Sequence, residues 1–377
     1  FDLFRTSLIY RGKRLVNWDT TLQTAVSNDE VENVTRKGHF WHFYYPVIDP
    51  QPGEPTRVEI ATTRPETMLG DTAVAVHPNP AKALDQVEAE LKVKLKDASD
   101  KERPPILEQL EALEERRQSM LDQLILLREM ARDGRHVMLP LVNREIPLVA
   151  DPWAKPELGS GCVKITPAHD ANDYEVGLRV GLPMINILNP DGTLNTEGGK
   201  YQGLTIKQAR KQVVDDLDQL ELLGDIEDRD IELPHSDRSK TPIEPYLADQ
   251  WFVAMDELSQ SAMDAVTDQR VQIFPSRYRK GYLDWLSEKR DWPVSRQLWW
   301  GHRIPIWSAT FSSAEEAEVL LGQIQSMPEF DGGEIATRTD SGSDGSTSLF
   351  VCLRDEHAAL EESIEALGLE RDPDVLD

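Results

Sequence analysis

The chain has 377 residues, 39% of them hydrophobic, and its 41 Lys and Arg against 67 Asp and Glu give a formal net charge of −26. That length supports two or three compact units, but the acidic balance excludes a general nucleic-acid coat, because phosphate binding depends on Lys and Arg. No apolar run approaches the ~20 residues that span a bilayer, and the two cysteines exclude a disulfide scaffold, so we expect a cytoplasmic chain without a membrane partner.

Short β-prone segments dominate the first half of the chain. Residues 40–45 and 58–61 flank a turn rich in Pro and Gly at 49–53, a pattern that predicts a β-hairpin. Five further β-prone runs follow at 73–76, 137–141, 146–149, 162–165 and 184–188. Their spacing favours a mixed-strand barrel or sandwich over parallel β-α-β units.

Residues 82–135 interrupt this pattern with helical periodicity. A short apolar stripe comes first, and a heptad seam follows it in steps of four and three: Ile106, Leu110, Leu113, Arg117, Met120, Leu124, Leu127 and Ala131. Pro104 and Pro105 are expected to separate the two helices. We predict an antiparallel helical hairpin that projects from the β-rich unit, either as a solvated arm or as a docking arm for a partner.

The second half of the chain contains clearer helix signals. Thr205 and Gln208 form a capping box for a helix over 205–223, and Gly224 lies at its expected end. A β-prone run at 349–353 precedes a helical segment that starts at Glu356, so we expect an α/β unit in the last third.

A first candidate site follows the β-prone run at 58–61. Thr62, Thr63, Arg64 and Thr67 surround Pro65, which favours a rigid turn. Hydroxyl groups can hold a water molecule or a sugar oxygen, and a guanidinium suits a phosphate. The alternative is a capped helix start with an arginine on the surface.

A second candidate site follows the run at 162–165. Lys164 and Thr166 are two residues apart and lie on one face of the predicted strand, and a turn with His169, Asp170 and Asp173 comes next. A cation, a hydroxyl and two carboxylates suit a small zwitterion that carries an ammonium and a hydroxyl. A polar helix cap is one alternative. A metal site at His169 and Asp170 is another, although no further His or Cys stands at ligand spacing.

The most basic stretch of the chain, residues 277–303, interleaves aromatic residues with Arg and Lys. Such a segment can stack on bases and contact phosphates. Alternatively, its Trp299–Trp300 pair belongs to a core and its arginines form a solvated face.

Four segments, read in order, resemble the valyl-tRNA synthetases, a family of class I aminoacyl-tRNA synthetases: residues 62–78, 159–177, 241–253 and 290–307. Arg64-Pro65-Glu66-Thr67 separates the chain from the leucyl enzymes, which favour Asp after the Pro, and from the isoleucyl enzymes, which lack the Arg. The resemblance implies a mixed α/β chain: a β-rich, barrel-like editing domain at 38–237 that carries the 82–135 hairpin. Partial Rossmann-type segments of a catalytic core would flank it at 1–37 and 238–377.

The resemblance also implies a function, hydrolysis of mischarged threonyl-tRNA(Val) in a parent enzyme that joins valine to tRNA(Val). We expect Asp170 to bind the α-ammonium of threonine, and Lys164, Thr166 and Asp173 to recognise its hydroxyl. Arg64 and Thr67, with Thr62 and Thr63, would position the nucleotide and the attacking water. The remaining matches would be remnants of the synthetic site: Trp292, Arg296, Trp299 and His302. His169 is expected to serve a structural role.

The chain also departs from the family pattern. The ATP-site signatures His-x-Gly-His and Lys-Met-Ser-Lys-Ser are absent from the sequence, and Pro293-Val294 stands where Cys-Ile is usual. We therefore expect a monomeric fragment that edits without a cofactor and does not activate valine, with ATP and Mg used only by the full-length parent. Its partners would be the acceptor end of tRNA(Val), threonine and valine. The alternatives are a leucyl or isoleucyl editing module, a metal-dependent hydrolase, and a scaffold built on the helical arm.

Overall fold

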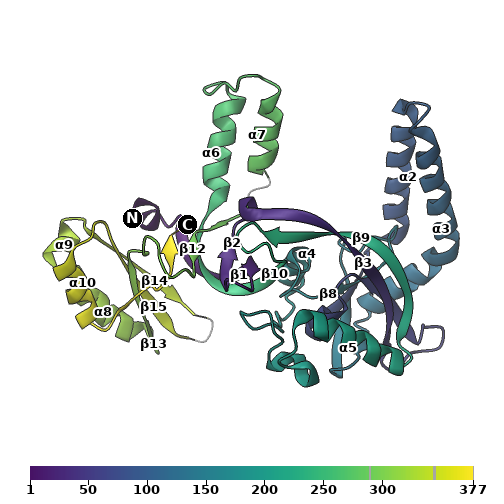
Figure 1. Cartoon of the computed structure of the whole chain (residues 1–377), viewed down its shortest axis with the longest axis horizontal. Coiled ribbons are helices and arrows are strands. Elements are labelled where there is room, and N and C mark those ends of the chain that lie inside the picture. The colour runs from purple at the N-terminus through teal and green to yellow at the C-terminus, as the bar shows by residue number, and fades with distance from the viewer. Residues whose placement is uncertain (288–289, 343–344, 377) are drawn as a thin grey trace. The chain divides into compact units, whose positions relative to one another are not determined.

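The computed structural model describes residues 1–287, 290–342 and 345–376, and the chain divides into two compact units (Figure 1). Unit 1 comprises residues 1–16, 23–30 and 248–377, and unit 2 comprises residues 17–22 and 31–247. In the described part of the chain, no helix has the length and apolar character needed to cross a membrane. The predicted domain limits at 37–38 and 237–238 stay predictions.

Unit 2 contains two open sheets. The first has the order β4-β3-β9 and is antiparallel, with β3 at Val31–Pro46, β4 at Arg57–Thr62 and β9 at Leu223–Ser236. The second has the order β6-β7-β5-β8, with β5 at Ala73–Val76, β6 at His136–Leu139, β7 at Arg144–Ala150 and β8 at Cys162–Ile165. In this sheet β5 runs parallel to β7 and antiparallel to β8.

The expected barrel is wrong, because neither sheet closes on itself within the described residues. Both sheets instead contribute side chains to one core, in which Phe43 and Ile60 of the first sheet join Val74 and Leu148 of the second. Two helices complete this core: α3 (Arg103–Arg132) with Leu124 and Leu127, and α5 (Ile206–Gln219) with Ala209, Val213 and Leu217. Unit 2 also contains the helical elements η2 (Pro65–Gly70), α4 (Ala171–Val180) and η3 (Thr196–Tyr201).

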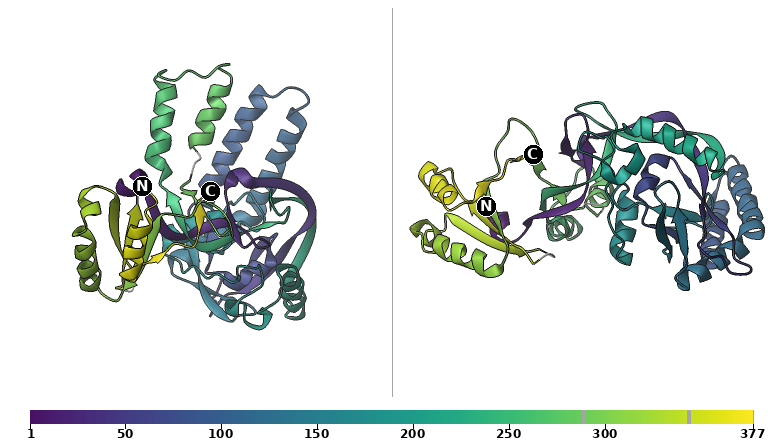
Figure 2. Two further views of the ribbon diagram at one scale, coloured as in Figure 1. Left: turned by 60° about the vertical axis from the view of Figure 1, so that its left-hand side comes forward. Right: turned by 90° about the horizontal axis from the view of Figure 1, so that it is seen from below.

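The predicted helical hairpin is present as α2 (Pro80–Asp97) and α3 (Arg103–Arg132), which lie side by side (Figures 1 and 2). The two prolines do not separate the helices. They lie in the first turn of α3, where the missing N–H groups would have no partner in the helix. The charged member of the seam, Arg117, forms ion pairs with Asp85 (2.8 Å) and Glu88 (3.2 Å) of α2.

Two other predictions of secondary structure are corrected. Residues 184–188 form no strand, because their backbone is bonded to side chains: Asn186 bonds both the N–H and the C=O of Leu188. The capping box of Thr205 and Gln208 is confirmed, but α5 ends at Gln219. Glu221 then adopts a positive φ of 57°, and Gly224 lies inside β9, where it approaches the backbone of His42.

Unit 1 begins with α1 (Asp2–Arg5), β2 (Thr24–Val26) and η1 (Asn28–Glu30). A sheet of order β11-β10-β1-β2 includes β1 (Ile9–Asp19), β10 (Ile243–Val253) and β11 (Trp292–Pro293), of which residues 17–19 and 243–247 are assigned to unit 2. The strand β12 (Ser295–Arg296) pairs with β17 (Val375–Leu376). The helices α6 (Met255–Thr267) and α7 (Tyr278–Ser287) form a second helical pair (Figure 2).

The last third of the chain contains the predicted strand and helix as β15 (Thr347–Leu353) and α10 (Ala358–Ala366). They belong to a β-α-β-β-α-β arrangement with β13 (Ile306–Phe311), α8 (Ala314–Gln325), α9 (Pro328–Asp331), β14 (Ile335–Ser341) and β16 (Glu370–Arg371). β15 pairs antiparallel with β13 and β14. Because the consecutive strands β14 and β15 pair antiparallel, this sheet is not the parallel sheet of a Rossmann-type core.

The core of unit 2 generates a stability prediction for α3. Leu124 is 1% exposed and packs in the main core, so Leu124→Ala should lower the free energy of unfolding by about 2–5 kcal/mol through lost burial and a residual cavity. Leu107→Ala, on the same helix at a position 52% exposed, should change it by less than about 0.5 kcal/mol. Urea unfolding of both variants measures the difference, and equal losses would contradict the burial of Leu124 in the core.

Candidate functional site

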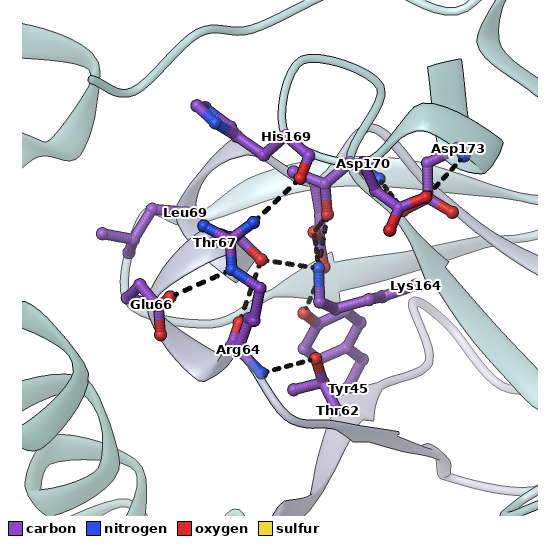
Figure 3. Close-up of polar contacts among 12 residues, drawn as sticks. Tyr45, Thr62, Arg64, Glu66, Thr67, Leu69, Lys164, His169, Asp170 and Asp173 are labelled. Carbon is purple, nitrogen blue, oxygen red and sulfur yellow. Dashed lines mark hydrogen bonds and ion pairs between the residues drawn. The ribbon is translucent and has the colours of Figure 1, made fainter. Parts of the chain in front are cut away.

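The two candidate segments of unit 2 meet at one place (Figure 3). Residues 62–67 leave β4 and enter η2, and Lys164 comes from β8. The register of β5 with β8 pairs Val74 with Lys164, and η2 leads directly into β5. The chain therefore brings the hydroxyl of Thr67 to the ammonium of Lys164, although the two residues are far apart in sequence.

A buried hydrogen-bond network forms the base of this site. The Lys164 ammonium donates to Thr67 Oγ1 (2.9 Å) and to Thr166 Oγ1, and it pairs with Asp71 Oδ1 at 3.3 Å. Its side chain is 9% exposed. All three donors of the ammonium are thus engaged, as burial of a charged group requires.

Asp71 and Tyr45 belong to this network, and the sequence analysis missed both. Asp71 is fully buried and accepts hydrogen bonds from Thr166 Oγ1 (2.5 Å) and from the Tyr45 hydroxyl (2.6 Å). Burial raises the pKa of Asp71, an effect that the Lys164 ammonium and the hydrogen bonds oppose. Burial and the Asp71 carboxylate raise the pKa of Tyr45 well above its ordinary value, so Tyr45 keeps its proton and remains a donor.

Arg64 lies at the rim of the site and is held in one orientation. Its Nη1 donates to the backbone oxygen of His169 (3.0 Å), its Nη2 pairs with Glu244, and its Nε lies 3.4 Å from Glu66. Glu66 also accepts two hydrogen bonds from Arg210 of α5 (2.8 and 2.9 Å). Burial opposes ionisation of Glu66, but the Arg210 and Arg64 guanidinium groups outweigh it and hold the pKa of Glu66 below its ordinary value.

Asp170 begins α4 as its N-cap. Its Oδ1 accepts from the backbone N–H groups of Asn172 (2.8 Å) and Asp173 (3.1 Å), which is the polar cap considered as an alternative. Capping uses one oxygen, so Oδ2 remains for a ligand, and the residue is partly exposed. Asp170 therefore combines a structural bond with a carboxylate oxygen that a substrate can reach.

Asp173 is nearly buried and connects three segments. Its Oδ1 accepts from the Trp153 indole (3.1 Å), and its Oδ2 accepts from the backbone N–H of Thr166 (2.9 Å). Burial and the nearby Asp170 raise the pKa of Asp173 to about 7. The bond to the Thr166 backbone fixes the chain at the end of β8, and so it fixes the position of the Thr166 hydroxyl.

His169 is buried, and its Nε2 accepts a hydrogen bond from the backbone N–H of Ile187 (2.9 Å). Burial and the neighbouring Arg64 and Lys164 charges lower the pKa of His169 to about 3, so it is neutral at pH 7. A metal ion would have to break the Nε2 bond to use that lone pair. Within residues 1–287, 290–342 and 345–376, no group of three His, Cys, Asp or Glu residues is placed to hold a metal.

The other predicted site residues fall in both units. In unit 2, Thr62 Oγ1 accepts from the backbone N–H of Arg64 (3.0 Å), and Thr63 is half-buried beside it in the same turn. In unit 1, Trp292 of β11 is 44% exposed, Trp299 is 99% exposed and His302 is also exposed, whereas Arg296 is buried and pairs with Glu30. The idea that the Trp299–Trp300 pair belongs to a core is wrong. Residues 288–289 of the basic stretch lie outside the described residues.

Comparison with known proteins gives consistent matches. The family model described as "tRNA synthetases class I (I, L, M and V)" matches residues 1–377. The valine–tRNA ligase of Rhodopirellula baltica is 69% identical over 382 residues, which covers 100% of this chain and 37% of that protein. Those of Francisella tularensis and Oceanobacillus iheyensis are 45% and 43% identical, over 81% and 85% of this chain and 28% and 30% of theirs. The chain thus spans about a third of the length of these relatives, and the resemblance predicted from its motifs is confirmed.

The low pKa of His169 predicts a pH dependence of stability. Because the folded pKa of about 3 lies below the ordinary 6.5, neutral His169 contributes stability above pH 6.5 that is lost as the pH falls toward 3. Between pH 7 and pH 5 the parent chain should lose about 2 kcal/mol more than His169→Gln, whose amide oxygen can still accept from Ile187. Urea unfolding at both pH values measures this loss, and the same pH dependence in both proteins would contradict it.

Proposed function

This chain belongs to the class I tRNA synthetases, and we propose that its unit 2 site removes threonine from mischarged threonyl-tRNA(Val). The single observation that carries the proposal is the buried Lys164, Thr67 and Thr166 network lying beside the partly exposed Asp170 and Arg64. The relatives named valine–tRNA ligases support the choice of valine as the amino acid of the parent reaction.

The proposed reaction answers a physical problem of valine recognition. Valine and threonine have nearly the same shape, and an apolar pocket cannot strongly reject an added hydroxyl. A discrimination of roughly 10²-fold is the figure already established for valine enzymes against threonine, not one derived from this structure. At about 1.4 kcal/mol per tenfold, that is under about 3 kcal/mol. A second site that binds threonine through its hydroxyl can add the missing selectivity.

The residues of the site suit these roles. Asp170 Oδ2 would bind the α-ammonium of the threonyl group, and Lys164 and Thr166 would recognise its hydroxyl. Asp173 is also expected from the sequence to recognise that hydroxyl, but its two oxygens accept from Trp153 and from the backbone of Thr166, so we propose that it holds Thr166 in place instead. The contacts of Arg64 with Glu66, Glu244 and the backbone of His169 fix the orientation of its guanidinium group. These contacts use three of its five N–H donors, and the others could bind the terminal nucleotide. Thr67, Thr62 and Thr63 would position the ribose and the attacking water.

Direct attack of water on the ester agrees with the state of the nearby side chains. Burial raises the pKa of the Cys162 thiol to about 12, which keeps it from acting as a thiolate. Neutral His169 has its Nε2 lone pair bonded to the Ile187 N–H. We propose that editing needs no cofactor, that its partner is the acceptor end of tRNA(Val), and that the chain acts as a monomer. Valine activation with ATP and Mg would belong to the longer enzyme.

Substitution of Asp170 tests the ammonium site without removing the cap. Asn caps a helix about as well as Asp, so Asp170→Asn should leave stability nearly unchanged but lower the rate of threonine release by at least about tenfold, because it loses a charge-assisted bond. Asp170→Ala should show the same fall in the rate of threonine release, and it should also lower the free energy of unfolding by about 1 kcal/mol because the helix cap is lost. Release of labelled threonine from threonyl-tRNA(Val) measures the rate.

Asp191→Ala is the matched control, since Asp191 lies in an exposed loop and accepts its hydrogen bonds from the neighbouring Thr193. It should retain the parent rate. Full activity of Asp170→Asn would remove Asp170 from the proposed role.

Chelation separates this reaction from a metal-dependent hydrolase at His169 and Asp170. With His169 Nε2 bonded to Ile187, EDTA should leave the deacylation rate within about twofold, and added zinc should not raise it. Loss of activity that zinc restores would favour the metal site.

The same release assay with mischarged tRNA(Leu) and tRNA(Ile) tests whether the chain is a leucyl or isoleucyl editing module. We expect little release of the amino acid from either tRNA.

A further inference from the structure

Behind the proposed site, one carboxylate gathers donors from separate parts of unit 2. Asp71 lies between η2 and β5, is fully buried, and receives Tyr45 of β3, Lys164 of β8 and Thr166, which follows β8. Its Oδ2 takes the Tyr45 hydroxyl, and its Oδ1 takes both Thr166 and Lys164. Both oxygens of Asp71 already accept hydrogen bonds from protein donors, so any effect of Asp71 on selectivity passes through Lys164 and Thr166.

We propose that Asp71, held by Tyr45, is the positioning residue that sets the preference of this site for an aminoacyl group with a hydroxyl. The inference rests on the proposed editing function and concerns the same site. Neither residue contacts the substrate; they determine where the Lys164 ammonium lies and in which direction the Thr166 hydroxyl donates.

The direction of each hydrogen bond determines which donors and acceptors the site presents to a substrate. Thr166 has one hydroxyl proton, and it is given to Asp71, so toward Lys164 and the site Thr166 presents only acceptor lone pairs. The Thr67 proton is likewise given to the backbone oxygen of Arg64 (2.9 Å). A substrate hydroxyl can accept from Lys164 in place of Thr67, or donate to Thr166, whereas a methyl group can do neither.

Asn has nearly the same shape as Asp, so Asp71→Asn would change the directions of the hydrogen bonds and leave the packing of the side chain nearly unchanged. The three donors would meet one carbonyl oxygen and one NH₂ group, which cannot accept their protons. Thr166 could then turn its proton toward the site, and Lys164 would lose its counter-charge. The site would no longer distinguish a hydroxyl from a methyl by a fixed pattern of donors and acceptors.

Unit 2 contains a second buried Tyr–Asp hydrogen bond with a lysine on the same carboxylate, and this group serves as a matched control. Tyr201 donates to Asp216 Oδ2 (2.6 Å), and Lys200 pairs with the same oxygen (2.9 Å). Tyr201 is buried like Tyr45, but Lys200 is 56% exposed, and the group lies between η3 and α5. Substitutions there remove an equivalent Tyr–Asp bond without touching Lys164 or Thr166.

The test measures kcat/KM for release of threonine and of valine from the same tRNA(Val), with the whole 377-residue chain. In Asp71→Asn the threonine-over-valine ratio should fall about 10- to 100-fold, the range for lost hydrogen bonds to charged groups. Tyr45→Phe, which removes one hydroxyl, should lower the ratio by a smaller factor. Tyr201→Phe and Asp216→Asn should keep it within about twofold.

A double variant separates positioning from a general loss of structure. If Asp71 acts through Thr166, then adding Asp71→Asn to Thr166→Val should lower the ratio by much less than it does in the parent chain. An unchanged ratio in folded Asp71→Asn, or an equal fall in Asp216→Asn, would overturn the inference while leaving the editing function intact. If Asp71→Asn does not fold, an unchanged ratio in Tyr45→Phe has the same meaning. A parent chain that releases no threonine would overturn both proposals.

Discussion

The burial of the Lys164 ammonium is the constraint on which the site of unit 2 depends. An unpaired charge in a protein interior is costly, so a buried lysine requires a counter-charge and an acceptor for every proton. Asp71, Thr67 and Thr166 meet this requirement. Thr67 and Asp71 precede β5 and Thr166 follows β8, which is paired with β5. The hydrogen bonds that stabilise the buried lysine therefore also hold the two candidate segments together.

A second arrangement of charges surrounds this centre and explains why the rim keeps its shape. Arg210, Glu66, Arg64 and Glu244 alternate in sign, so each carboxylate lies against a guanidinium and the group of four is neutral. Arg64 is therefore not a free cation that attracts any phosphate in a chain of net charge −26. It is a fixed set of N–H donors, and this favours recognition of one geometry over general attraction to nucleic acid.

The sequence contained much of this site, but not its centre. The strands at 73–76 and 162–165, the capping box at Thr205 and the polar residues from Thr62 to Asp173 follow from local patterns, because periodicity and capping act over a few residues. The roles of Asp71 and Tyr45 depend on long-range register, which local patterns do not determine. The same limit applies to residues 184–188, whose apolar composition indicates a strand while side chains satisfy their backbone.

The network is complete without a substrate, and this decides how such a site can select. A threonyl hydroxyl that replaces Thr67 as an acceptor for Lys164 exchanges one hydrogen bond for another, so it gains little net free energy. A valyl methyl group in the same place leaves a buried donor unpaired, which costs about 1–3 kcal/mol. In the proposed editing reaction, selectivity would then come from a penalty on valine more than from attraction to threonine. Because two sites that act in succession multiply their discrimination, even this modest penalty would add about a tenfold to hundredfold factor to that of the first pocket.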